Sequence, residues 1–267
     1  MKHPASLPRG MNNDRAFWRT AISSVRPNEI RVRGYDLMEL IGSRPFGDVV
    51  YLLLSGDLPK GNEGRMMDAL LVAACEHSVL APSVNAARFV ASAGVPLQAA
   101  VAAGTIGLGD FHGGAVESGA DMLLEADQTQ KLPREAAMHV AYLRKEDGLR
   151  LPGYGHAVHD PDPRGRKLLA VAGELGLSNR YVELARAFES VSKEVFGRPL
   201  AMNIDGAMAA ILLELGLEPG LGKALYVIGR AAGLVAHVYE EQSRERPYRD
   251  VGWKNVRYEG PGARTPR

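Results

Sequence analysis

Segments rich in alanine, leucine and glycine, with apolar residues at helical spacing, follow one another through most of the chain. Short breaks that contain glycine or proline separate them, as expected where helices begin and end. Runs of Val, Ile and Thr with a period of two, which would predict strands, are almost absent. The pattern therefore predicts an all-α fold, with helices over residues 46–54, 66–75, 83–92, 96–106, 115–126, 133–145, 166–175, 181–196, 207–215 and 222–241.

Composition and length narrow the class of protein further. The 267 residues are 46% hydrophobic and 24% charged, which is enough for one large core or two lobes. A net charge of +1 gives no basic footprint for nucleic acid. Cys75 is the single cysteine, so neither a disulfide framework nor a cysteine-based zinc site is predicted.

The N-terminal residues and the apolar runs of the chain show no targeting or membrane signal. Residues 1–18 are polar and lack the apolar stretch of a signal peptide. No run reaches the roughly 18 uninterrupted apolar residues typical of a membrane-spanning helix. We therefore expect a cytoplasmic protein that does not contact membranes.

One long break between two helical segments concentrates chemically useful residues. It runs from Leu151 to Arg164 and has the sequence LPGYGHAVHDPDPR. Gly153 and Gly155 lack a Cβ, so a ligand can approach the backbone closely there. His156 can exchange a proton near neutral pH, and Arg164 offers a planar fork for a carboxylate or phosphate. Taken alone, the stretch also fits a stiff connector with incidental histidines.

Other breaks also carry ionisable residues. Arginine suits a substrate with several carboxylates, and histidine and aspartate suit proton transfer at carbon or oxygen. The residues concerned are His77, His112, Asp205 beside Asn203, Arg230 and Arg246.

Each of these residues also has a purely structural interpretation. Near a helix end, His77 could interact with the helix dipole, and His112 could be a buried histidine bonded to backbone. Asp205 could be the N-cap of the helix that follows it. Arg230 and Arg246 could be surface charges. For any one residue the structural role is the more common, so the case for function depends on their occurring together.

The ordered set of motifs resembles the citrate synthase superfamily. The resemblance is carried by 153–158 followed by Asp162-Pro163-Arg164. Agreeing stretches, in order, are 33–36, 46–59, 112–115, 203–206, 229–230 and 246–247. It covers roughly residues 18–248, and the ordered set is far more specific than a lone Gly-His-Ala.

The resemblance implies roles for three candidate catalytic residues. His156 would handle the proton on the carbonyl or hydroxyl oxygen of the substrate. Asp205 would move a proton at the methyl carbon of acetyl-CoA. His112 would hydrogen-bond the thioester oxygen and stabilise the enol.

The resemblance also implies binding residues. The carboxylates of oxaloacetate or citrate would be held by His77, Arg164, Arg230 and Arg246. Asn203 is a further predicted substrate-binding residue. Coenzyme A, as a thioester substrate or product, would be cradled by Leu151, Pro152, Gly153, Tyr154 and Gly155. In the family the arginine that matches Arg246 comes from the other subunit, which implies a homodimer or a higher homo-oligomer.

A metal is not expected. His156 and His159 lie three residues apart, which could suggest a metal pair, but no matching cysteine or acid cluster accompanies them.

The layout is more compact than in full-length citrate synthases. Only 17 residues, 60–76, separate Pro59 from His77. This is similar to the citryl-CoA lyase module found alone or at the C-terminal end of ATP-citrate lyase. The sequence Asn-Ile-Asp-Gly at 203–206 and the tail 246–253 also look more like that module.

The favoured prediction is therefore cleavage of citryl-CoA to acetyl-CoA and oxaloacetate. A citrate or methylcitrate-type synthase is the first alternative, because the same groups run the condensation. A non-catalytic relative that binds coenzyme A or a tricarboxylate is the second, although the complete set of acids, bases and arginines argues against it. The predicted large helical domain combines 1–113 with 218–267, the small one spans 114–217, and the active site lies between them.

Overall fold

A computed structural model describes residues 18–156 and 158–266 of the chain. Helices dominate it, which confirms the predicted fold class. They are α1 (Leu37–Leu40), α2 (Phe46–Ser55), α3 (Glu63–Cys75), α4 (Pro82–Ser92), α5 (Leu97–Ile106), α6 (Ala115–Gln128), α7 (Pro133–Glu146), α8 (Pro163–Glu174), α9 (Arg180–Phe196), α10 (Ile204–Glu214) and α11 (Gly222–Arg244). Two short 3-10 turns, η1 (Pro219–Leu221) and η2 (Trp253–Asn255), complete the helical elements.

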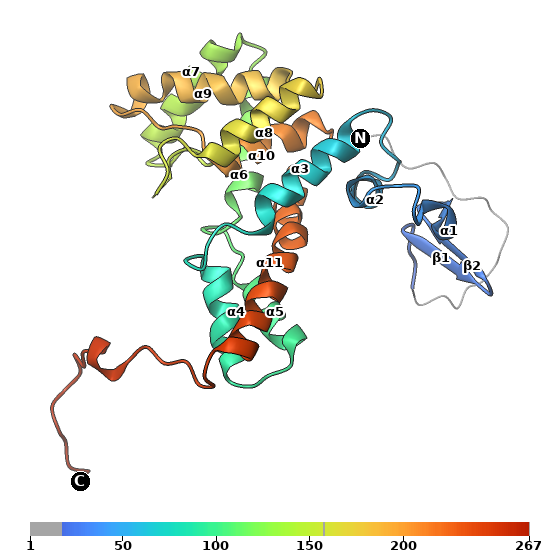
Figure 1. Ribbon diagram of the computed structural model, residues 1–267. Coiled ribbons are helices and arrows are strands. Elements are labelled where there is room, and N and C mark those ends of the chain that lie inside the picture. Colours follow the sequence, from blue (N-terminus) through green and yellow to red (C-terminus); the bar gives the residue numbers. More distant parts are fainter. Residues whose placement is uncertain (1–17, 157, 267) are drawn as a thin grey trace.

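The helices form two groups joined by α3 and α11 (Figure 1). Helices α6 to α10 pack together in the upper group, and α4 and α5 pack on the C-terminal part of α11 in the lower one. Helix α10 lies at the centre of the upper group, against α6, α8 and α9. It is apolar on every face, as expected of a helix enclosed by others, and nine of its residues are buried.

The main hydrophobic core does not stop at the predicted domain boundaries. It runs from Leu71 on α3 through Val116 on α6 and Leu212 on α10 to Leu225 on α11. A second, smaller cluster fills the lower group and includes Val84, Ala100 and Leu234. The division into domains at residues 114 and 217 stays a prediction.

A small antiparallel sheet lies at the N-terminal side of the described chain. Its strands β1 (Ser23–Arg26), β2 (Glu29–Val32) and β3 (Tyr35–Asp36) are ordered β1-β2-β3. Residues 18–30 alternate only weakly between apolar and polar side chains. The side chains of the sheet are mostly exposed, so no core-facing pattern marks its strands in the sequence. Asp36 caps α1, since its side chain accepts a hydrogen bond from the Met38 amide at 2.8 Å.

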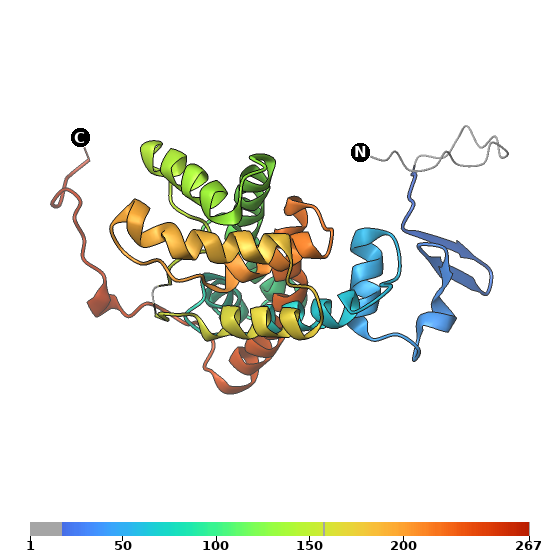
Figure 2. The ribbon, with the colours of Figure 1, turned by 90° about the horizontal axis from the view of Figure 1, so that it is seen from above.

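The sheet and the C-terminal tail leave the helical body on opposite sides (Figure 2). Both tryptophans of the chain lie in these extensions: Trp18 is 93% exposed and Trp253 81% exposed. The tail begins at a fixed point, because the Tyr248 amide donates to Ser92 O at 2.8 Å. Arg249 pairs there with the buried carboxylate of Glu241 at 2.8 Å.

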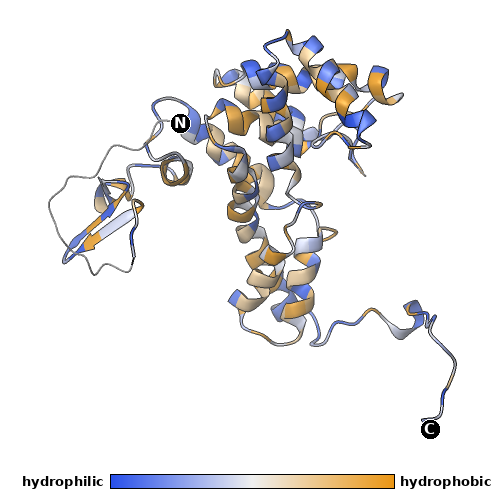
Figure 3. Cartoon of the chain, turned by 180° about the vertical axis from the view of Figure 1, so that it is seen from behind, coloured by the Kyte–Doolittle hydropathy of each residue, from blue (hydrophilic) through white to orange (hydrophobic). Residues whose placement is uncertain are grey.

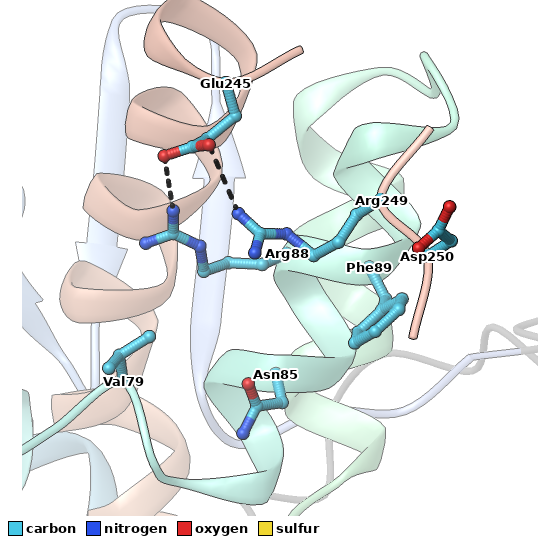
Figure 4. Close-up of a pocket in the computed structure, with 7 residues that line it drawn as sticks. All are labelled: Val79, Asn85, Arg88, Phe89, Glu245, Arg249 and Asp250. Atoms are coloured by element: carbon cyan, nitrogen blue, oxygen red, sulfur yellow. Dashed lines mark ion pairs between the residues drawn. The ribbon is translucent and has the colours of Figure 1, made fainter. Parts of the chain in front are cut away.

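Arg88 of α4 also takes part in holding the start of the tail. Its guanidinium pairs with Glu241, and both it and Arg249 lie 3.7 Å from Glu245 (Figure 4). The tail is therefore held to the lower group by a network of charges and by backbone hydrogen bonds.

By length and composition alone, the stretch Pro219–Arg244 could cross a membrane. Its apolar window is 44% buried, and α11 packs against α3, α4 and α5.

Candidate active site

A cavity of about 530 Å³ brings together four of the predicted site residues. They come from distant parts of the sequence: His77 after α3, His112 before α6, His156 in the long loop and Arg164 at the start of α8. The cavity is also lined by Ser78, Leu80, Ala81, Pro82, Val158 and His159.

Asp205 occupies the first turn of α10, where sequence reasoning expected an interruption between helices. Asn203 is the N-cap: its side-chain oxygen accepts from the amides of Asp205 and Gly206 at 2.9 and 3.3 Å. The Asp205 carboxylate is thereby released from capping, and its Oδ1 accepts a hydrogen bond from the Tyr226 hydroxyl at 2.6 Å. Burial raises the pKa of Asp205, although Tyr226 and Arg164 oppose that rise.

The glycine-rich loop is pinned directly to the start of α10. Gly153 O accepts from the Asn203 amide at 3.0 Å, and the Asn203 side-chain nitrogen donates to Gly155 O at 2.7 Å. Gly153 has φ of +85°, and a Cβ there would lie 2.5 Å from the Cα of Gly206. Only glycine fits this position, because the left-handed backbone and the close approach both exclude a side chain.

Asn203, predicted to bind substrate, thus has its side chain engaged within the protein on both sides. A direct contact with substrate stays a prediction.

Asp162 links the loop to both Arg164 and α10. It is only 1% exposed, and it caps α8 by accepting from the Arg164 amide at 3.0 Å. It also accepts from Arg164 Nε at 3.1 Å and NH2 at 2.8 Å, and from the Ile204 amide at 3.1 Å. Arg164, expected at the end of the loop, therefore lies in the first turn of α8 with one edge of its guanidinium already paired. Its buried NH1 has no hydrogen-bond partner among the described residues.

Arg230 on α11 is fully buried and has fewer hydrogen-bond partners than Arg164. Its Nε donates to Ala74 O at 2.9 Å, but neither NH1 nor NH2 has a hydrogen-bond partner in the described part of the chain. Burial lowers its pKa. The surface-charge interpretation of Arg230 is wrong, and a buried, unsatisfied guanidinium is the kind of group that a substrate carboxylate would neutralise.

His77 lies beside these two arginines. Partial burial, followed by the charges of Arg230 and Arg164, lowers its pKa to about 4, so it is neutral at pH 7. A neutral imidazole can donate or accept a hydrogen bond there without adding a third positive charge.

His112 is held in a tight turn in which its backbone pairs with Gly109 in both directions, at 3.0 and 2.9 Å. Its Nε2 lies 2.8 Å from Ser83 Oγ, at the start of α4. Burial, and then the charge of Arg230, lower its pKa. His112 is therefore neutral near pH 7 and positioned by a side chain as well as by backbone.

His156 has a defined ring orientation. Its Nδ1 accepts from the amides of Val158 and His159, both at 3.0 Å. A neutral ring held in this way carries its proton on Nε2, which is then a donor. The ring of His159 stacks on it with centroids 4.8 Å apart.

The predicted coenzyme A loop borders a second cavity, of about 620 Å³. Leu151, Tyr154 and Gly155 line it, and His156 belongs to both cavities. Arg150 and Arg198 also line it, and these cations suit the phosphates of a nucleotide. The remaining lining residues are Leu149, Phe196 and Leu200, whereas Pro152 and Gly153 lie in the same loop but do not line the cavity.

Arg246 is not brought together with the other predicted residues. It is exposed beyond the end of α11, and it lines a shallow pocket with Glu241, Arg244, Glu245 and Arg249. Its assignment to a partner's site stays a prediction.

Sequence reasoning missed three residues that position the site: Ser83, Asp162 and Tyr226. Asp162 had a usable signal, because Asp followed by Pro is typical of an N-cap and the first position of a helix. Ser83 and Tyr226 had none, since each occupies an ordinary position in a helical segment.

Among the described residues, no group of three or more His, Cys, Asp or Glu side chains could hold a metal ion.

Comparison with known proteins supplies the family context. The family model described as "Citrate synthase, C-terminal domain" matches residues 60–250. The structure is similar to that of citryl-CoA lyase from Hydrogenobacter thermophilus, with a TM-score of 0.88 and 36% identity over 94% of this chain and 98% of that one.

Two further relatives are longer than this chain. A citrate/2-methylcitrate synthase of Bacillus subtilis is 31% identical over 219 residues, which are 80% of this chain and 56% of the relative. ATP citrate lyase from Methanothrix soehngenii, solved in complex with citrate and coenzyme A, shares the fold with a TM-score of 0.79 at 22% identity, over 92% of this chain and 42% of that one. The chain therefore spans about half the length of the curated synthase that it matches.

Proposed function

The chain belongs to the citrate synthase family, and from that premise we propose that it is a citryl-CoA lyase. One observation supports the lyase over a synthase: the structure matches a citryl-CoA lyase with a TM-score of 0.88 at 36% identity, whereas it matches a citrate synthase from Thermotoga maritima with a TM-score of only 0.58 at 17% identity. The site described above provides the acids, bases and cations that the cleavage needs.

The substrate would be held by its carboxylates. Citryl-CoA carries two free carboxylates, and the buried NH1 and NH2 of Arg230 and the NH1 of Arg164 are the donors still available for them. Pairing with a carboxylate removes the cost of the unsatisfied guanidinium groups. The bond to be cleaved would thereby be fixed between His156 and Asp205, which is the positioning contribution to catalysis.

Cleavage then needs two proton movements. The hydroxyl proton of citryl-CoA passes to His156, and the carbon–carbon bond breaks to give oxaloacetate and the enolate of acetyl-CoA. His112 stabilises the charge on the thioester oxygen by donating a hydrogen bond. Protonated Asp205 then delivers its proton to the terminal carbon, and burial, which raises its pKa, favours the protonated form that this step requires.

The ring orientation of His156 bears on the direction of the reaction. With Nδ1 accepting from two amides, Nε2–H suits donation to the carbonyl oxygen of oxaloacetate during condensation. In cleavage, Nε2 must instead accept the hydroxyl proton, so those two contacts must open as substrate binds.

A homodimer is the second part of the proposal. The outer faces of α5 and α11 expose small and apolar side chains, among them Ala102, Ile106, Ala232, Val235 and Tyr239. Figure 3 shows hydrophobic colours running through this lower group of helices. Exposed apolar side chains on neighbouring helices are typical of an interface, and we expect a second copy packed there to bring a tail with Arg246 toward its neighbour.

An assay with synthetic citryl-CoA tests the activity directly. We expect oxaloacetate and acetyl-CoA to appear in equal amounts, with no free citrate, and Asp205→Asn to remove this activity. Release of citrate and coenzyme A would instead indicate a hydrolysing synthase, the alternative that 31% identity to the Bacillus subtilis enzyme favours. Tight binding of coenzyme A without turnover in either direction would favour a non-catalytic relative.

A further inference from the structure

Tyr226 lies between two of the predicted catalytic groups. It is on α11, is 3% exposed, and donates its hydroxyl hydrogen to Asp205 Oδ1 at 2.6 Å. The other end of its side chain packs against the turn that carries His112: a Cβ added to Gly113 would lie 3.3 Å from Cγ of Tyr226. One buried side chain therefore contacts both the carboxylate and the histidine turn.

The contact matters because the two groups come from separate elements. Asp205 lies on α10, whereas His112 lies in the loop between α5 and α6. The carboxylate of an aspartate rotates easily about its last bond, since that torsion has no sharp staggered minima. A hydrogen bond to Oδ1 removes this freedom and leaves Oδ2 as the oxygen that can face a substrate.

We propose that Tyr226 is a positioning residue, which fixes the Asp205 carboxylate so that its second oxygen faces the methyl carbon of the acyl group and which sets the separation between Asp205 and the His112 turn. The proposal rests on the proposed function, because it assigns Tyr226 a part in that same reaction.

The charges around Asp205 determine how the loss of the Tyr226 hydroxyl would act. Arg164 of α8 and His156 of the loop favour the ionised carboxylate, whereas Asp162 disfavours it. Burial is the largest influence and raises the pKa of Asp205, and the hydrogen bond from Tyr226 opposes that rise. Arg230 faces the tyrosine from its own helix and favours ionisation of Tyr226, although burial keeps that pKa well above 10. Tyr226 is therefore a neutral donor, and its removal should raise the pKa of Asp205 further.

Tyr226→Phe removes only the hydroxyl and keeps the ring that packs on Gly113. We expect kcat for citryl-CoA cleavage to fall on the order of 10- to 100-fold, with KM changed less than about threefold, because a misaligned proton donor affects the chemical step. The high-pH limb of the kcat profile should move up by about one pH unit, since cleavage needs protonated Asp205. Tyr51→Phe is the matched control: its hydroxyl bonds Leu215 O at 3.4 Å, outside the site, and this variant should match the wild type.

A second measurement does not depend on activity. In protein labelled with ¹³C at aspartate carboxyl carbons, the Asp205 signal is identified by its loss in Asp205→Asn and is titrated by NMR. Its pKa should be higher by about one unit in Tyr226→Phe than in the wild type. Unchanged titration together with a kcat within twofold of the wild type would overturn the role of Tyr226. A wild-type protein that releases no oxaloacetate would count against the proposed function, and the NMR titration would then still decide whether Tyr226 controls Asp205.

Discussion

At the start of α10 the functional groups are held by hydrogen bonds within one chain, whereas the outer face of the lower helices leaves apolar side chains exposed. Around Asp205, the Asn203 cap, Gly153, Asp162 and Tyr226 hold loop, helix and carboxylate together through hydrogen bonds within the chain. On the lower group, by contrast, Ile106, Val235 and Tyr239 are 83%, 41% and 67% exposed.

We expect this difference to separate two parts of the proposed activity: the part that one chain supplies by itself and the part that depends on a second subunit. The Asp205 carboxylate is held by contacts within one copy, so its geometry should survive dilution to the monomer. In the proposed dimer, Arg246 would contribute only to a neighbour's site, because in one copy it lies with Arg244 and Arg249 at the base of the tail. The following experiments separate the two contributions.

The largest effect is expected for Asp205→Asn. The change keeps size and polarity but removes the proton that the enol carbon needs, so turnover should fall about 10²–10⁴-fold while coenzyme A binding is retained. Steady-state cleavage assays and calorimetric titration provide the two readouts. Asp127→Asn, which breaks a half-exposed pair with Arg180 at 2.7 Å, is the control and should leave both unchanged. A loss below about threefold would show that Asp205 does not transfer the proton.

Arg246→Ala tests the contribution that we propose for a neighbouring subunit. Alone it should lower kcat/KM by roughly ten- to a hundred-fold, as expected for the loss of a charged contact to a carboxylate. We would then mix Arg246→Ala subunits with Asp205→Asn subunits and let the dimers reassemble. Half of randomly formed dimers are hybrids, and one of the two sites in each hybrid has both Asp205 and a neighbour's Arg246 intact. The mixture should therefore regain about a quarter of wild-type activity. Failure of the mixture to recover activity, with hybrid dimers verified by mass, would place Arg246 outside the partner's site.

Arg230→Met should separate binding from stability. Affinity for oxaloacetate should fall roughly ten- to a hundred-fold, while the melting temperature without substrate rises by about 2–4 °C because a buried, unsatisfied charge is gone. Arg88→Met provides the contrast within the lower group, since it leaves buried Glu241 with one cation fewer and should lower the melting temperature. If both variants were destabilised alike, the unsatisfied state of Arg230 would not be a cost to the fold.

The smallest effect concerns a proton at His77. Its pKa of about 4 lies below the usual value of 6.5, and substrate carboxylates close to Arg230 and Arg164 would raise it. Binding of oxaloacetate near pH 5–6 should therefore take up a fraction of a proton, and affinity should increase as the pH falls from 7 toward 5. Calorimetry in two buffers with different ionisation enthalpies measures this uptake. His77→Gln should abolish it, and His139→Gln, on an exposed part of α7, should not.

The sequence predicted the helices and the residues that meet in the main cavity, because both leave local or ordered signals. Helical spacing placed most helix ends within a few residues of those observed. The ordered motifs identified His112, His156 and Arg164, and the resemblance that they carry added His77. What it could not predict depends on contacts between elements. Whether Asp205 caps α10 or is left free depends on which neighbour accepts from the first amides, and that neighbour is Asn203.

The hydrogen bond of Tyr226 is a second contact between elements that the local sequence does not predict. Its position in an apolar helical segment predicts a core aromatic, and its ring is indeed buried. Only the packing of α11 against α10 directs its hydroxyl to Asp205. Likewise, the unsatisfied guanidinium of Arg230 follows from burial beneath α3 and is not encoded in its local sequence.

The location of the two tryptophans has a practical consequence for spectroscopy. Trp18 and Trp253 lie in the extensions on opposite sides of the body, and neither lines the cavity with the histidines. In a single copy, emission excited at wavelengths that only indole absorbs will therefore be red-shifted and open to quenching by iodide. In the proposed dimer, a neighbouring subunit that covers the tail would shift this signal to the blue, so the intrinsic fluorescence of this protein would report on assembly.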